Sequence, residues 1–100
     1  MNFENLYSII AERKKAMPKN SYTVSLFRQG LDRIIQKLGE EAVEVVIAAK
    51  DKRKNKTIQE VADLFFIVTV LLVSKNITLQ EIYEELGKRR TGKKNFTDTS

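Results

Sequence analysis

The chain has 100 residues, of which 42% are hydrophobic and 31% charged, a composition typical of one small soluble domain that excludes an intrinsically disordered chain. It contains neither cysteine nor histidine, which excludes disulfide bonds, Cys- or His-ligated transition metals and a Ser-His-Asp triad. The net charge of +5 favours an anionic partner, namely nucleic acid, an acidic surface or a polyphosphate-bearing small molecule, although a solvated lysine-rich surface explains the same charge.

The N-terminal segment predicts an amphipathic helix over about residues 2–17. The helix is expected to stop before Pro18, because the residue that precedes a proline disfavours the helical conformation. Its apolar face comprises Phe3, Leu6, Tyr7 and Ile10. The segment has no basic stretch followed by an apolar stretch, so we expect no signal peptide and a cytoplasmic protein.

A second, long helix is predicted over about residues 23–52, after a loop with the sequence PKNSY. Gly30 falls inside this helix and weakens it, so a kink or a break is expected there. The run KDKRKNK at the end of the helix is expected to be a polar connector.

The third predicted helix, over about residues 58–74, is apolar on every side. Three other helices of so short a chain do not readily cover such a helix. We therefore expect two copies of the chain to pack against each other through it. Its longest apolar run, from Leu64 to Val73, is too short to span a bilayer, and no membrane contact is expected.

The fourth predicted helix covers about residues 79–89. Its apolar stripe comprises Leu79, Ile82, Tyr83 and Leu86. The third and fourth helices both begin with a capping-box pattern, Thr57-x-x-Glu60 and Thr78-x-x-Glu81. The sequence thus predicts a single all-α domain, a bundle of four to five helices over residues 1–90, and a flexible polar tail over residues 91–100.

The segment KLGEEAVEVVIAAK, residues 37–50, carries three acids on a helix that is otherwise largely apolar. At about 100° per residue, Glu40, Glu41 and Glu44 form a narrow polar stripe. Lys37 projects between them one turn earlier. The other directions belong to apolar residues that we expect to face the core, namely Val43, Val45, Val46, Ile47 and Ala49.

The third helix offers two more acids, Glu60 and Asp63, one turn apart near its N-terminal end. The connector is short enough for the second and third helices to form an antiparallel hairpin, which would bring both sets of acids together. Facing carboxylates repel each other and cost several kcal/mol of desolvation each, unless a cation or hydrogen bonds compensate. Oxygen ligands on facing helices therefore predict a site for a hard divalent cation, Mg²⁺ or in its place Mn²⁺.

Each acid also has a purely structural interpretation. Glu41 can pair with Lys37 four residues earlier, which stabilises an exposed helix by tenths of a kcal/mol. Glu60 can complete the capping box of Thr57, and Asp63 can interact with the helix dipole. The presence of all the acids on two neighbouring helices favours the metal site.

Gly39 precedes the acids inside the same helix. Glycine there costs about 1 kcal/mol relative to alanine. It indicates either close packing of two helices or room for a ligand beside Glu40.

Several motifs together resemble one enzyme family. SYT at residues 21–23, Leu26, Gly30, KLGEEAVE at residues 37–44 and EVADL at residues 60–64 are similar to the pattern of phosphoribosyl-ATP pyrophosphohydrolases. These enzymes belong to the MazG-like all-α nucleotide pyrophosphohydrolases, which share the E-E-x-x-E and E-x-x-D elements. SYT, the glycine and the K-x-G-E-E-A block point to the member that acts in histidine biosynthesis.

The resemblance implies an all-α bundle completed by homodimerisation. It also implies Mg²⁺-dependent hydrolysis of 1-(5-phosphoribosyl)-ATP to 1-(5-phosphoribosyl)-AMP and pyrophosphate, the second step of histidine biosynthesis. Such chemistry requires a metal ion, a positioned water and cationic groups around the phosphates, and no histidine.

The resemblance further implies roles for individual residues. The metal ligands would be Glu41, Glu44, Glu60 and Asp63. Glu40 is the candidate to orient or deprotonate the attacking water, or to hold a second ion, and Lys37 is expected to contact the phosphates. The substrate-binding residues would be Ser21, Tyr22, Thr23, Lys37 and Arg89, the last facing the site of the partner subunit.

Two other functions compete with this one. A housekeeping MazG-like hydrolase of nucleoside triphosphates such as dUTP would share the metal site and differ in its base and ribose pockets. A non-catalytic basic helical module would bind nucleic acid, but the aromatic residues mostly fall on apolar stripes rather than among the Lys and Arg clusters, and the acidic stripe would repel phosphates. We therefore expect phosphoribosyl-ATP and a second copy of the chain as partners, and neither nucleic acid nor a membrane.

Overall fold

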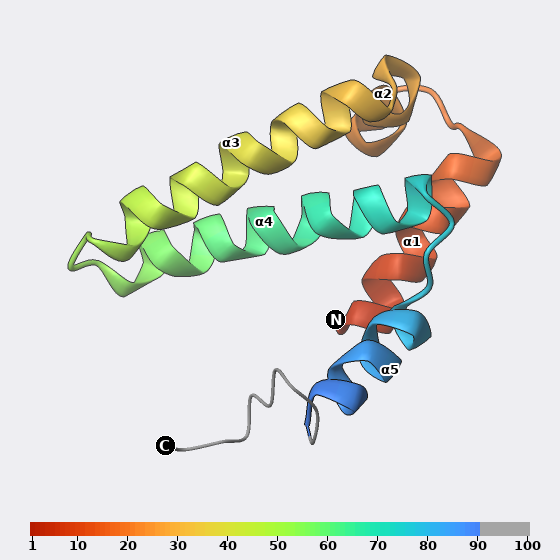
Figure 1. Ribbon diagram of the computed structural model, residues 1–100. Coiled ribbons are helices and arrows are strands. Elements are labelled where there is room, and N and C mark those ends of the chain that lie inside the picture. Colours follow the sequence, from red (N-terminus) through yellow and green to blue (C-terminus); the bar gives the residue numbers. More distant parts are fainter. Residues whose placement is uncertain (91–100) are drawn as a thin grey trace.

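The computed structural model describes residues 1–90, which form five α-helices and no strand (Figure 1). The helices are α1 (Phe3–Ala16), α2 (Tyr22–Gln29), α3 (Leu31–Ala49), α4 (Lys54–Ser74) and α5 (Leu79–Arg89). The predicted all-α fold class is therefore confirmed. The polar tail predicted over residues 91–100 lies outside the described residues.

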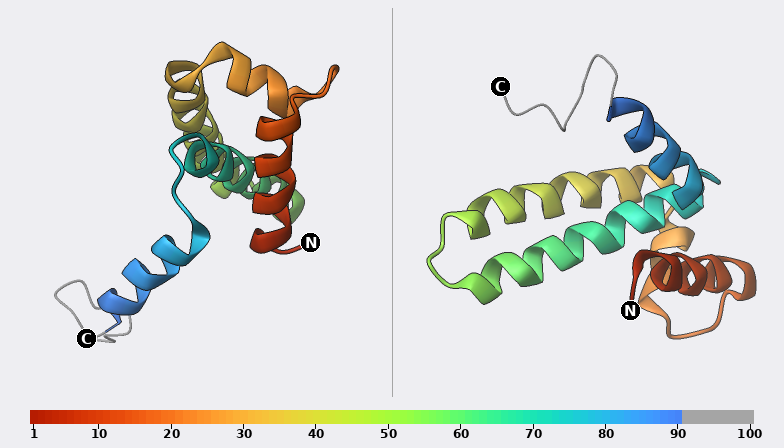
Figure 2. Two further views of the ribbon diagram at one scale, coloured as in Figure 1. Left: turned by 90° about the vertical axis from the view of Figure 1, so that its right-hand side faces the viewer. Right: turned by 90° about the horizontal axis from the view of Figure 1, so that it is seen from below.

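The helices α3 and α4 form a long antiparallel hairpin, as predicted, and the other helices gather at its open end (Figure 1). There α1 packs on α4 and α2 packs on α3 and α1. The last helix, α5, packs on α1 and projects away from the hairpin (Figure 2). The hairpin thus places side by side the two helices that carry the acids.

The break that the sequence predicts near Gly30 is present. Gly30 has φ 95° and ψ 174°, a conformation that L-residues with a side chain rarely adopt, and it separates α2 from α3. The start of α2 is capped by the Ser21 hydroxyl, which accepts a hydrogen bond of 3.2 Å from the backbone N–H of Val24. Two separate helices therefore replace one continuous helix, and α3 is aligned independently of α2.

The helix α4, which corresponds to the third helix predicted from the sequence, begins at Lys54 and not near residue 58. The capping box predicted at Thr57 is therefore wrong. Thr57 lies inside α4, and its hydroxyl donates a hydrogen bond of 3.1 Å to the carbonyl oxygen of Ala48 on α3. This bond ties the two helices together next to their connector. The capping box of Thr78 and Glu81 at the start of α5 is confirmed.

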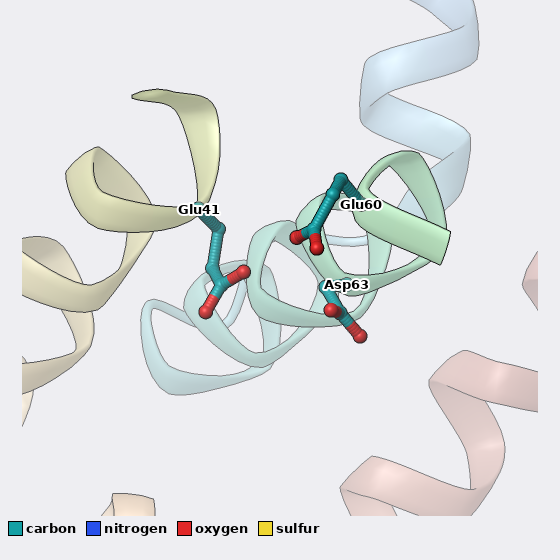
Figure 3. Close-up of side chains that lie close together, drawn as sticks. All are labelled: Glu41, Glu60 and Asp63. Carbon is teal, nitrogen blue, oxygen red and sulfur yellow. The ribbon is translucent and has the colours of Figure 1, made fainter. Parts of the chain in front are cut away.

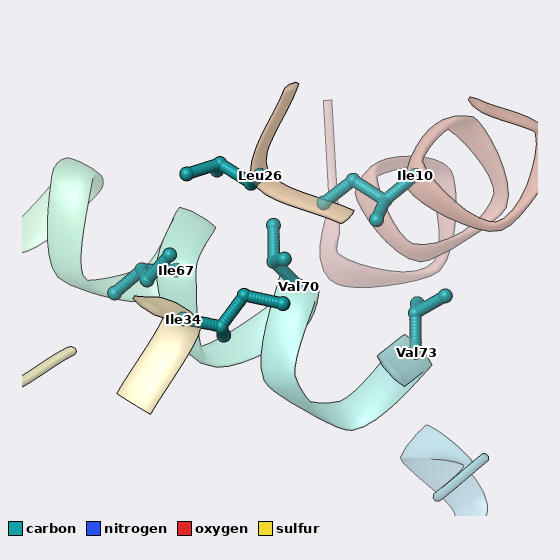
Figure 4. Packing of buried hydrophobic residues seen from close by; sticks show 6 residues of the cluster. All are labelled: Ile10, Leu26, Ile34, Ile67, Val70 and Val73. Carbon is teal, nitrogen blue, oxygen red and sulfur yellow. The ribbon is translucent and has the colours of Figure 1, made fainter. Parts of the chain in front are cut away.

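A compact apolar cluster fixes the open end of the hairpin (Figure 4). Its buried members are Ile10, Leu26, Ile34, Ile67, Val70 and Val73. One residue comes from each of α1, α2 and α3, and three come from α4. Burial of each such side chain contributes about 1.5–3 kcal/mol, so this cluster sets how α3 is rotated against α4.

The outer face of α3 is not buried, which corrects the expectation that its apolar residues face the core. Val43, Val46 and Ile47 are 57%, 61% and 60% exposed, Ala49 is also exposed, and only Val45 is half-buried. The reason is that the described helices cover α3 on the side of α4 and leave its opposite side open (Figure 2).

The helix α4 is long and apolar enough to cross a membrane by length and composition alone. A core helix of a soluble protein meets the same criterion, and α4 packs along α3 and α1 and supplies half of the buried cluster. Its outer side remains apolar and open, with Phe65 45% exposed.

Candidate active site

Three carboxylates meet where α3 faces α4 (Figure 3). Glu41 reaches across from α3, and Glu60 and Asp63 lie one turn apart on α4. Each residue offers an oxygen atom, and these atoms lie within 4.8 Å of one another. The hairpin therefore brings together three of the four acids that were proposed as metal ligands.

The remaining two acids of the α3 stripe do not belong to this three-carboxylate cluster. Glu44 lies one turn nearer the connector and lines a cavity together with Glu60. Glu40 is exposed and forms an ion pair of 3.5 Å with Arg33 and a hydrogen bond of 3.3 Å with Gln36. Glu44 is thus adjacent to the three-carboxylate cluster, whereas Glu40 pairs with residues of its own helix.

Lys37 adjoins the cluster through Glu41. Its Nζ lies 3.2 Å from Glu41 Oε1, and the two side chains are only 21% and 16% exposed. The hydrogen bond to Glu41 raises the pKa of Lys37, and Tyr22 raises it further, against a smaller opposing effect of burial. The Tyr22 ring in turn stacks on Phe66 with 6.0 Å between ring centroids. Lys37 is therefore a firmly positive charge placed between an aromatic pair and the carboxylates.

The other proposed substrate-binding residues are spread over the molecule. Ser21 caps α2, and Thr23 is half-buried in the first turn of that helix. Arg89 lies on α5, where its Nε is 3.4 Å from Glu85 Oε2. The helix α5, which carries Arg89, projects away from the hairpin that carries the carboxylates (Figure 2).

Sequence reasoning missed a basic residue beside the cluster. Lys56, on the first turn of α4, lines the same cavity as Glu44 and Glu60. From the sequence, the whole run KDKRKNK was expected to be a polar connector. The only indication of a binding residue in this run was its excess of lysine and arginine. Which of those cations faces the hairpin interface depends on where α4 begins.

The donor set fits a hard divalent cation. Carboxylate oxygens on two facing helices suit Mg²⁺, which takes a few carboxylates and keeps several waters. Cations on both sides of the acids, Lys37 and Lys56, suit an anionic substrate. A helical hairpin with facing carboxylates and flanking lysines suits an all-α hydrolase that acts on a phosphoanhydride.

Comparisons with known proteins narrow this class. The family model for phosphoribosyl-ATP pyrophosphohydrolase matches residues 3–90. The phosphoribosyl-ATP pyrophosphatase of Leptospira biflexa is 49% identical over 86 residues, which are 86% of this chain and 94% of that protein. The enzyme of the same name from Clostridium novyi is 46% identical over 87% of this chain and 79% of its own length. A bifunctional histidine biosynthesis protein of Caldanaerobacter subterraneus is 51% identical over 84% of this chain and 41% of that protein.

The chain belongs to the phosphoribosyl-ATP pyrophosphohydrolase family. This confirms the resemblance that the SYT, K-x-G-E-E-A and E-x-x-D motifs indicated.

Proposed function

We propose that the protein hydrolyses 1-(5-phosphoribosyl)-ATP to 1-(5-phosphoribosyl)-AMP and pyrophosphate, the second step of histidine biosynthesis. The observation that carries this proposal is the meeting of Glu41, Glu60 and Asp63 in a chain of this family. The reaction adds the oxygen of water to phosphorus, breaks the α–β phosphoanhydride bond and releases one proton. Because the chain contains no histidine, the nearby carboxylates are our candidates to take that proton.

The proposal includes a resident Mg²⁺, for which Mn²⁺ can substitute. Glu41, Glu60 and Asp63 would hold it, with Glu44 available from the next turn of α3. When bound, the ion would neutralise the charge that develops on the phosphate oxygens. Glu40 remains our candidate to orient or deprotonate the attacking water, for which it must leave Arg33.

Lys37 and Tyr22 support the substrate side of the proposal. Lys37 stays protonated across the physiological range and can donate to phosphate oxygens once Glu41 turns toward a cation. Tyr22 is exposed, although its ring stacks on Phe66, so its free face is available to a nucleoside. Ser21 fixes the start of α2 by accepting a hydrogen bond from the N–H of Val24, and Ser21 and Thr23 remain proposed substrate-binding residues beside Tyr22.

We also propose a homodimer in the cytoplasm. Support comes from the apolar surface that α3 and α4 leave open, which is typical of an interface rather than of a monomer. In such a dimer, Arg89 on the projecting α5 would serve the site of the partner subunit.

The activity can be tested on the purified protein by measuring pyrophosphate release from phosphoribosyl-ATP and from dUTP, with and without Mg²⁺. We expect Mg²⁺-dependent release from phosphoribosyl-ATP and much slower release from dUTP. Faster turnover of dUTP would contradict the proposed substrate.

The ligand role can be tested with Asp63→Asn, because Asp63 is exposed and its loss should leave the fold intact. Even residues that only support metal ligands contribute about 10–100-fold, so loss of a ligand should lower kcat/KM by more than about 100-fold. The matched control is Glu12→Gln, which removes one charge from the exposed surface of α1. Near-full Mg²⁺-dependent activity of Asp63→Asn would exclude Asp63 as a ligand.

A further inference from the structure

A cavity of about 230 Å³ lies at the connector end of the hairpin, directly beside the carboxylate cluster. Its lining consists of Glu44, Ile47, Ala48, Asp51, Arg53, Lys56 and Glu60. Glu60 belongs both to this lining and to the three-carboxylate cluster. The cavity therefore continues the proposed active site toward the connector and is not a separate hollow.

The two cations of the cavity are not equivalent. The Arg53 guanidinium binds the Asp51 carboxylate through Nε at 3.1 Å and Nη2 at 2.8 Å, and this pairing lowers the pKa of Asp51. The Lys56 ammonium forms no hydrogen bond or ion pair with another residue among residues 1–90, and only its charge acts on Asp51 from a distance. Lys56 is thus half-buried in the cavity wall with its three N–H donors available.

The order of residues along α3 gives the site two different ends. Lys37 comes first, Glu41 follows one turn later, and Ala48 and Asp51 lie at the connector. The Lys37 end adjoins the stacked rings of Tyr22 and Phe66, whereas the connector end is a small, charged cavity. An aromatic end suits a nucleobase or ribose, and a charged end suits phosphate.

We propose that this cavity binds the pyrophosphate end of the substrate and the pyrophosphate product, with Lys56 donating to its oxygens. The proposal rests on the proposed function and adds the direction in which the nucleotide lies. At about 230 Å³ the cavity is smaller than the roughly 300–1,000 Å³ of a typical complete ligand site, so it admits a part of the nucleotide and not the whole.

The charges of the cavity impose a condition on this binding. Three carboxylates, of Glu44, Asp51 and Glu60, face two cations, so the cavity by itself disfavours an anion. A divalent cation on Glu60 would add two positive charges at the edge of the cavity and offset this excess of carboxylates. Pyrophosphate is therefore expected to bind with Mg²⁺ and not in the presence of EDTA.

The test is a calorimetric titration of the full chain with pyrophosphate in Mg²⁺, comparing Lys56→Ala with Lys54→Ala. Lys54 is exposed, lies on the same first turn of α4 and does not line the cavity, so both variants lose the same charge. A hydrogen bond to a charged group contributes about 1.5–3 kcal/mol, so Lys56→Ala should weaken pyrophosphate binding by roughly tenfold or more. Lys54→Ala should remain within about twofold of the wild type, as expected for an exposed charge.

Rescue separates a direct contact from a structural effect. Lys56→Arg keeps the charge and the donors, and should recover most of the binding that Lys56→Ala loses. Equal pyrophosphate affinities of Lys56→Ala, Lys54→Ala and the wild type would overturn the assignment. The proposed function is tested by a different measurement, namely whether the wild type hydrolyses phosphoribosyl-ATP.

Discussion

The Glu41 carboxylate lies between a cation and two other acids. Lys37 donates to it from one side, and Glu60 and Asp63 approach from the other. The ion pair offsets the repulsion among three carboxylates whose oxygen atoms lie within 4.8 Å of one another. Because the two side chains are half-buried, salt screens their attraction less than that of an exposed pair at the same helical spacing.

The pairing of Lys37 with Glu41 predicts a pH effect. Because the pKa of Lys37 in the folded chain is raised above 10.5, the pair stabilises the fold fully below the unfolded pKa, and this stability is lost as the pH rises through the folded pKa. Glu41→Gln should lower the pKa of Lys37 toward 10.5, as followed by NMR of the lysine side chain without divalent cations. Glu12→Gln should leave it unchanged, and an unaltered pKa in Glu41→Gln would show that the pair is not formed in solution.

At the scale of the helices, two glycines have opposite meanings. Gly30 adopts a positive φ of 95° that separates α2 from α3, whereas Gly39 lies within α3. A Cβ built at either position has no heavy atom within 4 Å. Close helix packing within the described chain therefore does not explain Gly39, and the space beside it is open to a ligand or to a second copy of the chain.

Substitution of each glycine by alanine should change stability in opposite directions. Gly30→Ala should lower the free energy of unfolding by about 1–3 kcal/mol, because alanine is strained at that φ. Gly39→Ala should raise it by about 0.5–1 kcal/mol, because alanine is the better helix former and has open space. Urea denaturation measures both, and each variant controls for the other. Destabilisation by Gly39→Ala would mean that a partner molecule packs there.

At the scale of the whole molecule, the described helices leave large apolar side chains exposed. The outer face of α3 exposes Val43, Val46 and Ile47. On α5, the exposed apolar residues are Ile82, Tyr83 and Leu86. On α4, Phe65 forms an edge-on contact with Phe3 at 5.3 Å between ring centroids, and both rings remain partly exposed beside an apolar cavity. A 100-residue chain gains most from association when such faces are covered by a second copy.

The proposed dimer predicts a response to a charge on α3. Val46→Asp should raise the dimer dissociation constant strongly, because an unpaired charge buried in an interface costs about 3–5 kcal/mol. Sedimentation equilibrium measures this constant. Ser8→Asp adds the same charge at an exposed polar position of α1 and should leave it unchanged. A monomeric wild type at micromolar concentration would rule out the homodimer, and a fully dimeric Val46→Asp would place the interface elsewhere.

The sequence by itself determined the features that depend on neighbouring residues. Helical spacing of apolar residues predicted the all-α class, and Pro18 predicted the end of α1. Gly30 indicated the break between α2 and α3, and Thr78 indicated the start of α5. The combined motifs were enough to identify the family, because each consists of definite residue types at definite spacing along α2, α3 and α4.

Only the tertiary structure decided which side chains meet. Helical spacing states the direction of a residue about its own axis, but the rotation of α3 against α4 comes from the packing of residues such as Ile34 and Ile67. That rotation points Glu41 at Glu60 and turns Val46 outward. The same rotation brings Lys56 into the cavity wall. The sequence alone could not predict this placement, because the position of Lys56 relative to Glu44 depends on contacts between residues far apart in the chain.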